Sequence, residues 1–557
     1  MAKIKLLALG GQDERNKSCL IVEINDEIYV FNVGVKLPVN TVNGISLITI
    51  DSDYLKNRME KIRGIFIGTP SFYNTTGLFL LLSKLKPSIP IYTNEVGEVV
   101  VKKLFESKHI KKSINPNIVV LQPGQDIDVG DNKVLPFRIA NSMPNSYGWI
   151  LKTEDGCIVF VDDFIVTNDR NKTFQSQLNN LQNYTKNNTL ALIVGINQAG
   201  IPGFATPQHK NKSFYESIIN HTEGKVIVGT HSNDAYTIFT LLSIAKQTNR
   251  PICIIGNTFL NVLKTTIEKG LFSSRKLIMI TKQKAVESKN AIIIIADNPN
   301  TYYETMTKFI HNQRKNIPIN ENDRLILGVT VLPGQEMNHA VICDELSRLD
   351  INYKSLPKNI IEMKACDEDH KLLINLLQPK YVIPHNGIYK YEVKLNDALQ
   401  STWIKQESIL TIDNGDVLNI VDGNLIKSHQ KIELNDNYVS TNHALDVGES
   451  IIYERNQMGS NGVIAMSLVF DKAHQKLFNY VKLEYFGVVN HKDLSSSKVE
   501  EIEATFKKRM GECLVYENKK LNIKETKFNL KRLLSKLFEK KFNRRPLVLP
   551  TFIDYVA

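Results

Sequence analysis

The sequence predicts an α/β protein with several domains: an αβ sandwich, an inserted module built on a parallel sheet, and a smaller α+β tail. A chain of 557 residues is too long for one core, since domains average ~150 residues. Short strand-like segments with turn residues dominate the first two hundred positions. From about residue 211, apolar strands alternate strictly with amphipathic helices, which is the pattern of a parallel sheet.

The N-terminal strands are predicted from short apolar segments separated by turn residues. Gly10-Gly11 and Asn25-Asp26 supply the turns between the first strands. The predicted strands cover 4–8, 19–24, 28–32, 65–67, 133–139, 148–153, 157–161 and 191–194, and a helix covers 76–85. Together these elements predict a layered αβ sandwich.

The inserted module is predicted from its strand–helix alternation. Its strands cover 226–229, 252–255, 291–295 and 325–328, and its helices cover 234–247, 259–269 and 303–313. The first of these helices carries Ile238, Leu241 and Leu242 at helical spacing. A helix over 367–377, a strand over 381–383 and further strands follow.

The tail, from about residue 446, combines strands with two amphipathic helices. The strands are predicted around 462–470, 479–488 and 546–552. The apolar stripes of the helices consist of Val499, Ile502, Phe506 and Met510, and of Leu530, Leu533, Leu534, Leu537 and Phe538. A segment of roughly a hundred residues is near the lower limit for burying its own core. We therefore expect a partner to cover part of this apolar surface.

Composition excludes several classes of protein and favours acidic partners. No apolar run approaches the ~18–20 residues of a membrane span, and no signal peptide precedes the first strand. The six cysteines are scattered without C-x-x-C spacing, as in reduced cytosolic proteins. We therefore expect a cytoplasmic protein without a membrane partner. The net charge of +11 favours nucleic acid as a partner, although a generally lysine-rich composition would also explain it.

Five segments together resemble the ribonuclease J family of β-CASP metallo-β-lactamase nucleases. They are A-L-G-G-Q-D-E at 8–14, G-I-F-I at 64–67, P-G-Q-E at 333–336, L-L-Q-P-K-Y-V-I-P-H-N-G at 376–387 and R-R-P-L-V-L-P at 544–550. These segments occur in the family's order and with its spacing, so the resemblance covers essentially the whole chain.

The resemblance implies four segments. A metallo-β-lactamase αββα sandwich would comprise residues 1–208 and 355–440. A β-CASP parallel α/β domain would be inserted at 209–354. A C-terminal α+β domain at 446–557 would serve assembly, because the family uses this domain for dimer contacts.

The resemblance also implies a centre with two Zn or Mn ions, and this sequence lacks its ligands. The family places an H-x-H-x-D-H cluster directly after the strand at 64–67, because imidazole and carboxylate groups hold the metals and the attacking water. The family's ligand positions, and one substrate-side histidine position, are occupied here by Thr69, Ser71, Tyr73, Asn74, Asn141, Asn386 and Lys364. Asp163 alone keeps a ligand identity. One carboxylate cannot hold two divalent cations, so we expect no metal, no cofactor and no catalytic residues.

Two other groups of residues are candidate sites. In the segment 230–234, a new acid/base or metal site is one interpretation, and a helix cap with a solvated His231 is the other. We favour the cap. His385 lies one residue before the ligand position and could pair with Asp163, but two ligands do not make a metal site.

Basic residues are the candidates for RNA contact, because phosphate binding needs only a charged surface and survives loss of catalysis. The alternative is a set of solvated helix faces. The candidates are Lys102, Lys103, Lys111, Lys112, Lys540, Lys541, Arg544 and Arg545.

Three hypotheses about function remain. The first is a catalytically inactive ribonuclease J-like subunit that binds RNA, itself or an active ribonuclease J paralogue. The second is an active metal-dependent 5′–3′ exo- or endoribonuclease with unorthodox ligands. The third is a pure protein scaffold with no role in RNA metabolism. Metal analysis separates the second from the others, and RNA retention at physiological salt separates the first from the third.

Overall fold

The computed structural model describes residues 2–38, 44–106, 114–169, 171–311, 317–426, 430–440, 446–447, 449–471, 473–489 and 497–554. The chain forms two compact units. One comprises residues 1–40 and 46–446, and the other comprises 41–45 and 447–557. In the described part of the chain, no helix is both long and apolar enough to cross a membrane.

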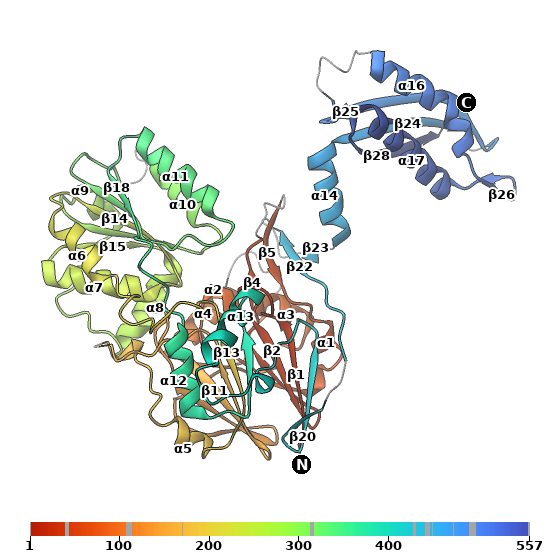
Figure 1. The fold of residues 1–557 in the computed structure, drawn as a ribbon. Helices are drawn as coiled ribbons and strands as arrows, with labels where there is room; N and C mark the ends of the chain where they lie inside the picture. The colour runs from red at the N-terminus through yellow and green to blue at the C-terminus, as the bar shows by residue number, and fades with distance from the viewer. Residues whose placement is uncertain are drawn as a thin grey trace. The chain divides into compact units, whose positions relative to one another are not determined.

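Two sheets packed face to face form the centre of the first unit (Figure 1). The first has the strand order β21-β20-β1-β2-β3-β6-β7-β8, and the second has the order β19-β13-β12-β11-β10-β9. The pairings β3–β6 and β6–β7 are parallel in the first sheet, as are β12–β13 and β13–β19 in the second. Each sheet therefore has a set of parallel strands whose carboxyl ends share one edge.

The elements of this sandwich are bounded as follows. The first sheet consists of β1 Lys3–Gly10, β2 Cys19–Ile24, β3 Glu27–Phe31, β6 Ile62–Phe66, β7 Ile91–Thr93, β8 Ile118–Val120, β20 Val417–Val421 and β21 Asn424–Ile426. The second consists of β9 Ile127–Val129, β10 Asn132–Arg138, β11 Tyr147–Thr153, β12 Gly156–Val161, β13 Thr189–Gly195 and β19 Tyr381–His385. The helices are α1 Asp53–Lys56, α2 Phe72–Thr75, α3 Leu78–Lys84, α4 Glu95–Phe105, α5 Leu181–Thr185, α12 Asp367–Leu377 and α13 Tyr389–Leu399, and a small sheet contains β4 Val35–Lys36, β5 Ile45–Thr49 and β22 Asn437–Ser440.

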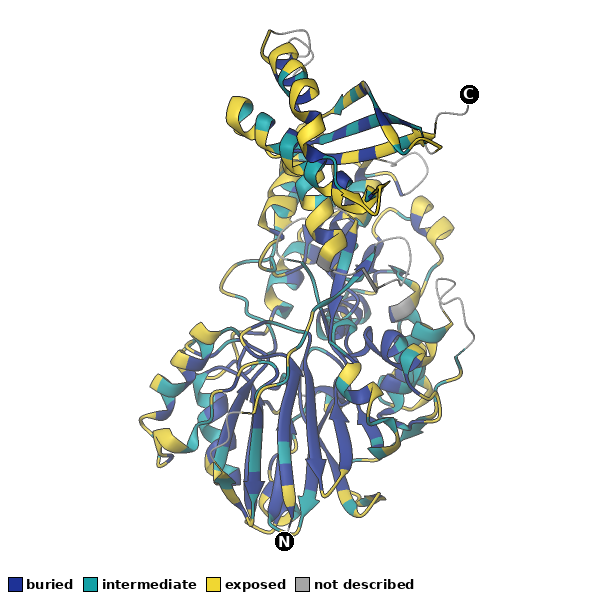
Figure 2. Cartoon of the chain, turned by 90° about the vertical axis from the view of Figure 1, so that its right-hand side faces the viewer, coloured by how far each residue is buried: buried dark blue, intermediate teal, exposed yellow. Residues whose placement is uncertain are grey.

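Three apolar cores hold the sandwich together. Facing residues of the two sheets, including Phe31, Phe66 and Trp149, form the middle core. Helices α1, α3 and α4 cover the outer face of the first sheet, and α5, α12 and α13 cover that of the second. The strands are accordingly buried on both faces, whereas the outer helices are exposed on one side (Figure 2). This arrangement confirms the predicted αββα sandwich.

The inserted module is a five-stranded parallel sheet with the order β15-β16-β14-β17-β18. Its strands are β14 Val226–His231, β15 Ile252–Ile255, β16 Ile292–Asp297, β17 Arg324–Leu327 and β18 Tyr353–Ser355. Its helices are α6 Lys212–Asn220, α7 Ala235–Thr248, α8 Asn257–Glu268, α9 Lys282–Glu287, α10 Tyr302–His311 and α11 Glu336–Arg348. Helices α6, α7 and α8 pack on one face of the sheet, and α10 and α11 pack on the other.

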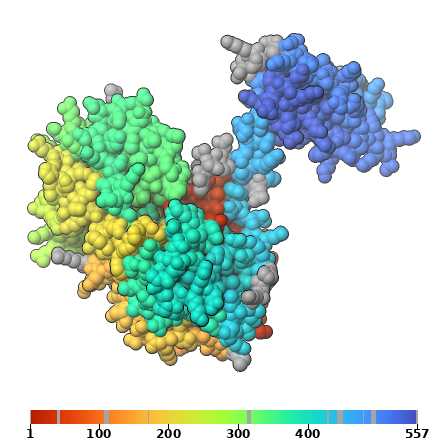
Figure 3. Space-filling model, in the orientation of Figure 1, coloured from red at the N-terminus to blue at the C-terminus, as the bar shows by residue number. Residues whose placement is uncertain are grey.

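After the module, the chain returns to the sandwich. Strand β19 pairs with β13 over five residues, and α12 packs beside α5. In the space-filling view, atoms of this returning segment (teal) lie against those of the earlier part of the sandwich (orange) (Figure 3). The return therefore adds the last strand of the second sheet at the edge next to β13.

The second unit is a three-stranded sheet covered on one face by two helices. Its elements are α14 Glu449–Asn461, β24 Val463–Asp471, β25 Lys476–Phe486, α16 Ser497–Arg509, β26 Tyr516–Glu517, β27 Lys520–Leu521, α17 Ile523–Phe542 and β28 Leu547–Asp554, and β23 Asp446–Val447 lies at the boundary with the first unit. The strand order is β25-β24-β28, with β28 parallel to β24. The apolar stripes of α16 and α17 are buried against this unit's own sheet. Most of the apolar surface for which a partner is expected is therefore covered within the unit, and Leu533 and Leu537 are only partly buried.

Candidate functional site

Polar residues gather where the parallel strands of the two sheets end. Asn32 follows β3, Thr69 to Asn74 follow β6, Asp162 and Asp163 follow β12, and Asn386 follows β19. The carboxyl ends of parallel strands meet at one edge of a sheet, so segments distant in sequence converge there. The resemblance places metal ligands in the segment from Thr69 to Asn74 and at Asp163 and Asn386, and Asn32 and Asp162 lie beside them.

The side chain at the centre of this cluster is Asp162, which directly precedes the retained Asp163. Its Oδ2 atom accepts hydrogen bonds from Nδ2 of Asn32 at 2.8 Å and Nδ2 of Asn74 at 3.0 Å. Its Oδ1 atom accepts one from Nδ2 of Asn386 at 2.7 Å. All four side chains are buried. Three amides thus satisfy a carboxylate that would otherwise be buried without partners.

Other contacts of the amides fix the direction in which each one donates. Asn386 Oδ1 accepts from the backbone N–H of Asn16 at 2.7 Å, so its Nδ2 must face Asp162. Asn74 Nδ2 also donates to the backbone oxygen of Thr69 at 3.3 Å, and Asn32 Nδ2 also donates to Ser18 Oγ at 3.1 Å. The amides therefore direct hydrogens, and not oxygen lone pairs, at the carboxylate.

The local backbone explains why asparagine occupies two of these positions. Asn32 has φ of 61° and Asn386 has φ of 52°. Among residues with a side chain, asparagine enters this left-handed region most readily. It therefore fits these strand ends and also supplies an amide donor.

Burial and neighbouring charges set the electrostatics of the cluster. Burial, reinforced by the Asp163 carboxylate, raises the pKa of Asp162 to about 7 against the opposing effect of the Asn386 and Asn74 amides. Burial also raises the pKa of Asp163, and the Lys364 ammonium opposes that shift. Lys364 Nζ lies 2.9 Å from Glu362 Oε2, and these side chains are 19% and 28% exposed. A side-chain cation therefore accompanies the carboxylates.

Asn141 connects two of the loops that surround the cluster. Its Nδ2 donates to Thr69 Oγ1 at 2.7 Å and to the backbone oxygen of Asp163 at 3.0 Å. Its Oδ1 accepts from Met143 N and Ser146 Oγ. Ser71 caps α2 by accepting from Asn74 N. These residues hold backbone segments together in positions where the resemblance places histidine ligands.

His385 is neutral and both of its ring nitrogens have partners. Gln12 Nε2 lies 3.2 Å from Nδ1, and Ser18 Oγ lies 2.8 Å from Nε2. With the Gln12 amide donating to Nδ1, Nε2–H donates to Ser18. Burial lowers the pKa of His385 to about 3. Neither nitrogen has a free lone pair with which to form the weak metal pair with Asp163.

The residues present do not fit a divalent metal centre. Zinc and manganese sites need converging imidazole nitrogens or carboxylate oxygens with free lone pairs. Among the described residues, no group of three or more His, Cys, Asp or Glu side chains could hold a metal ion. The lone pairs of Asp162 are directed at amide hydrogens, and Tyr73, at the family's aspartate position, has a buried hydroxyl without a hydrogen-bond partner.

The segment 230–234 in the inserted module acts as a helix cap. Asp234 Oδ1 accepts from Thr237 N at 3.2 Å and caps α7, as predicted. The prediction that His231 is solvated is wrong, because this residue is 9% exposed and its Nε2 has no hydrogen-bond partner. Burial lowers the pKa of His231 to about 4. His231 is therefore a neutral core residue at the end of β14.

Most of the basic candidates contact other groups of their own domain. Lys102 pairs with Glu98, Lys103 with Glu106, Lys541 with Glu501 and Arg545 with Glu539. Arg544 donates to the backbone oxygen of Val488 at 2.7 Å, and Lys540 is exposed. Lys111 and Lys112 lie outside the described residues. The paired lysines are solvent-exposed, so each ion pair contributes little and does not prevent phosphate contact.

Sequence reasoning missed two features. Asp162 was not predicted, although the asparagines near the ligand positions are amide donors that need an acceptor. Also not predicted were Lys524, Lys527 and Lys531, whose spacing of three and four residues places them on one side of α17.

Two parts of the chain match sequence models of known domains. Residues 223–346 match the ribonuclease J β-CASP domain, and residues 450–555 match the ribonuclease J C-terminal domain. A crystal structure of an Enterococcus faecalis protein of unknown function superposes with a TM-score of 0.52 at 12% identity, covering 75% of this chain and all of that one. This likeness concerns the fold alone, which is a metallo-β-lactamase-type fold carrying a β-CASP module.

Relatives extend over the whole chain. The uncharacterized protein MG423 of Mycoplasma genitalium is 33% identical over 569 aligned positions, which cover 100% of both chains. Ribonuclease J2 of Bacillus subtilis is 24% identical over 99% of this chain and 98% of its own. The chain therefore belongs to the ribonuclease J family.

Proposed function

We propose that this protein is a catalytically inactive, cytoplasmic ribonuclease J subunit of RNA processing or decay. In this role it binds RNA weakly and with little sequence preference. It assembles, through its C-terminal domain, with itself or with an active ribonuclease J paralogue. No bound metal takes part.

The observation that supports inactivity is the set of three amides around Asp162. A hydrolase of this family needs metal ions to bridge and activate water. Here Asn32, Asn74 and Asn386 direct N–H groups at Asp162, the residue directly before the one retained ligand. The one retained ligand, Asp163, has Asn197 Nδ2 at 3.4 Å and Lys364 as a charged neighbour. The site is built as a hydrogen-bonded core.

Charge supports the RNA-binding part of the proposal. The net charge is +11, and a basic surface supplies the sequence-independent part of nucleic-acid affinity. We keep Lys102, Lys103, Lys111, Lys112, Lys540, Lys541, Arg544 and Arg545 as candidate contacts. Those that form exposed ion pairs can leave the carboxylate and bind a phosphate instead, because an exposed ion pair contributes little free energy.

An open sheet face supports the assembly part. We take residues 446–557 as the assembly domain and 1–208, 209–354 and 355–440 as the other three segments. Helices α16 and α17 cover only one face of the C-terminal sheet. On the opposite face, Tyr480, Phe486 and Ile553 are 60%, 58% and 50% exposed. Exposed apolar side chains on one sheet face mark an interaction surface.

The test combines metal analysis with a nuclease assay. We expect purified protein to contain no stoichiometric zinc or manganese and to leave 5′-monophosphorylated single-stranded RNA intact when manganese is added. The Asp163→Ala variant serves as the control, because a contaminating nuclease would act equally in both preparations. Degradation by the parent protein that Asp163→Ala abolishes would show an active enzyme with unorthodox ligands. Failure to retain RNA even at low salt would favour the scaffold.

A further inference from the structure

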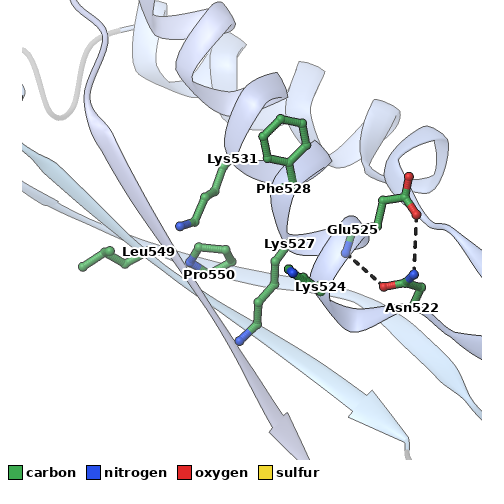
Figure 4. Close-up of a pocket in the computed structure, with 8 residues that line it drawn as sticks. All are labelled: Asn522, Lys524, Glu525, Lys527, Phe528, Lys531, Leu549 and Pro550. Carbon is green, nitrogen blue, oxygen red and sulfur yellow. Dashed lines mark hydrogen bonds between the residues drawn. The ribbon is translucent and has the colours of Figure 1, made fainter. Parts of the chain in front are cut away.

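A groove of about 700 Å³ lies between α17 and the edge strand β28 of the C-terminal unit. Side chains from both elements line it (Figure 4). The lining residues are Asn522, Lys524, Glu525, Lys527, Phe528, Lys531, Leu549 and Pro550. The groove belongs to none of the sites described above.

The groove carries unneutralised positive charge. No carboxylate in the described part of the chain lies within ion-pair distance of Lys524, Lys527 or Lys531. The lining acid, Glu525, instead interacts with Asn522, which caps the helix by accepting from Glu525 N at 3.1 Å. Helix α17 holds seven basic and two acidic residues. The three lysines span about 10 Å of helix, given a rise of 1.5 Å per residue.

The same groove exposes an aromatic ring and aliphatic surface. Phe528 is 61% exposed and Leu549 is 44% exposed. Phe528 lies between Lys527 and Lys531 in the sequence of the helix, and all three side chains line the groove (Figure 4). A ligand that fits must therefore offer both anionic groups and a flat apolar surface.

Single-stranded nucleic acid has this combination, and we propose that the groove is an RNA-binding site. A base stacks on Phe528 while neighbouring phosphates contact Lys524, Lys527 and Lys531. Proteins that bind single strands without sequence preference combine aromatic platforms with basic residues in this way. The inference rests on the proposed RNA-binding function and adds a site that the candidate lysines do not include.

An acidic peptide fits the groove less well. Extended peptides bind edge strands by adding a strand, and this requires free backbone N–H groups along the edge. Strand β28 is an edge strand, and Pro550 at the groove has no N–H to give. Proline and lysine at an edge protect it from strand addition.

A tryptophan reporter tests the stacking directly in the full-length chain. The sequence contains two tryptophans, of which Trp149 is buried and Trp403 is 51% exposed. In the Trp403→Phe background, Phe528→Trp places an exposed indole in the groove. We expect an oligoadenylate of roughly ten nucleotides to quench its emission. An abasic oligonucleotide of equal length should bind by charge without comparable quenching.

Affinity measurements complete the test. Phe528→Ala should weaken oligoadenylate binding about tenfold, and Phe528→Tyr should retain it. The triple change of Lys524, Lys527 and Lys531 to Gln should weaken binding and reduce the salt slope by about 2, at ~0.7 per phosphate contact. The matched control changes Lys476, Lys498 and Lys508 to Gln, which removes the same charge from exposed positions outside the groove.

The outcomes separate the site from the function. If RNA binds with equal affinity to the parent, the groove triple variant and Phe528→Ala, the groove is not the site, although RNA binding itself stands. If an acidic peptide quenches the reporter and RNA does not, the assignment to nucleic acid is wrong. If no RNA binds at low salt, the site and the proposed function both fail. Circular dichroism spectra of all variants should match the parent, because the substituted side chains are at least partly exposed.

Discussion

Asn386 Nδ2 lies 2.7 Å from Asp162 Oδ1, and this contact joins the ends of β19 and β12 across the second sheet. The two residues are 224 positions apart in the sequence. Together with Asn32 and Asn74 they connect both sheets at the edge where the resemblance places two metal ions. Hydrogen bonds thus link the loops there, and this gives the cluster a structural role that can be measured.

Removing the Asn386 amide should destabilise the fold. We expect Asn386→Gly to lower the free energy of unfolding by roughly 1–3 kcal/mol, because it leaves a buried carboxylate oxygen without its donor. Asn386→Ala should cost about 1 kcal/mol more, because alanine does not favour the φ of 52° at this position. Urea denaturation of both variants separates the hydrogen bond from the backbone effect. Stability equal to the parent in the glycine variant would show that the amide cluster is not structural.

Gly11 lies against the end of β19, where its backbone oxygen accepts a hydrogen bond from Asn386 N at 2.7 Å. A Cβ atom at this residue would lie 2.6 Å from His385 Cε1, and the φ of +94° is already unfavourable for other residues. We expect Gly11→Ala to destabilise the protein by roughly 2–4 kcal/mol. Gly270→Ala is the matched control, because its φ is +68° and nothing lies within 4 Å of an added Cβ. In thermal unfolding, the free energy of unfolding of Gly270→Ala should fall by about 1 kcal/mol only. Equal losses of stability in the two variants would argue against the close contact at Gly11.

Glu392 should make stability depend on pH. This residue is 2% exposed, and its Oε2 has no hydrogen-bond partner. Burial raises the pKa of Glu392 to about 7. A hydrogen bond with Thr411 lowers this pKa, whereas the nearby carboxylates of Asp13 and Asp413 raise it. Because the folded pKa is raised, the folded state holds a proton that the unfolded state loses near pH ~4.3. The stability contributed by this proton is complete below that pH and disappears as pH rises through 7.

The isosteric change Glu392→Gln removes this titration. We expect it to raise the free energy of unfolding at about pH 8 by up to ~3 kcal/mol and to have little effect at about pH 4. Glu407→Gln, at a side chain that is 79% exposed, controls for loss of charge alone. Urea denaturation at both pH values provides the measurement. A gain of equal size at the two pH values would contradict the raised pKa.

The local pattern of apolar and turn residues is enough to predict much of the fold, whereas the rest depends on tertiary contacts. The strand predicted at 226–229 is confirmed as β14 Val226–His231. Its short apolar run predicted a strand buried on both faces, and all of its residues are buried. The helix α14 Glu449–Asn461 was not predicted, because polar residues interrupt any apolar stripe in it. The partners of Asp162 come from three segments far apart in the chain, so no spacing in the sequence reveals them. Likewise, unpaired lysines can be recognised only when every nearby carboxylate has been located.

The open face of the C-terminal sheet should hold the assembly together. Phe486 and Ile553 are exposed on this face, opposite the one that α16 and α17 cover. A symmetric dimer is the simplest arrangement that would bury such a face against its own copy.

We expect the double change of Phe486 and Ile553 to Lys to reduce the mass measured by light scattering to that of a monomer, because two buried ammonium groups would have no partners. Met337→Lys, at a residue that is 74% exposed on α11, is the matched control and should leave the mass unchanged. Deletion of 446–557 should have the same effect as the double change and should remove any ribonuclease J paralogue from a pull-down. If the double variant and the truncated protein both keep the parent's oligomeric mass, the subunits assemble through another surface.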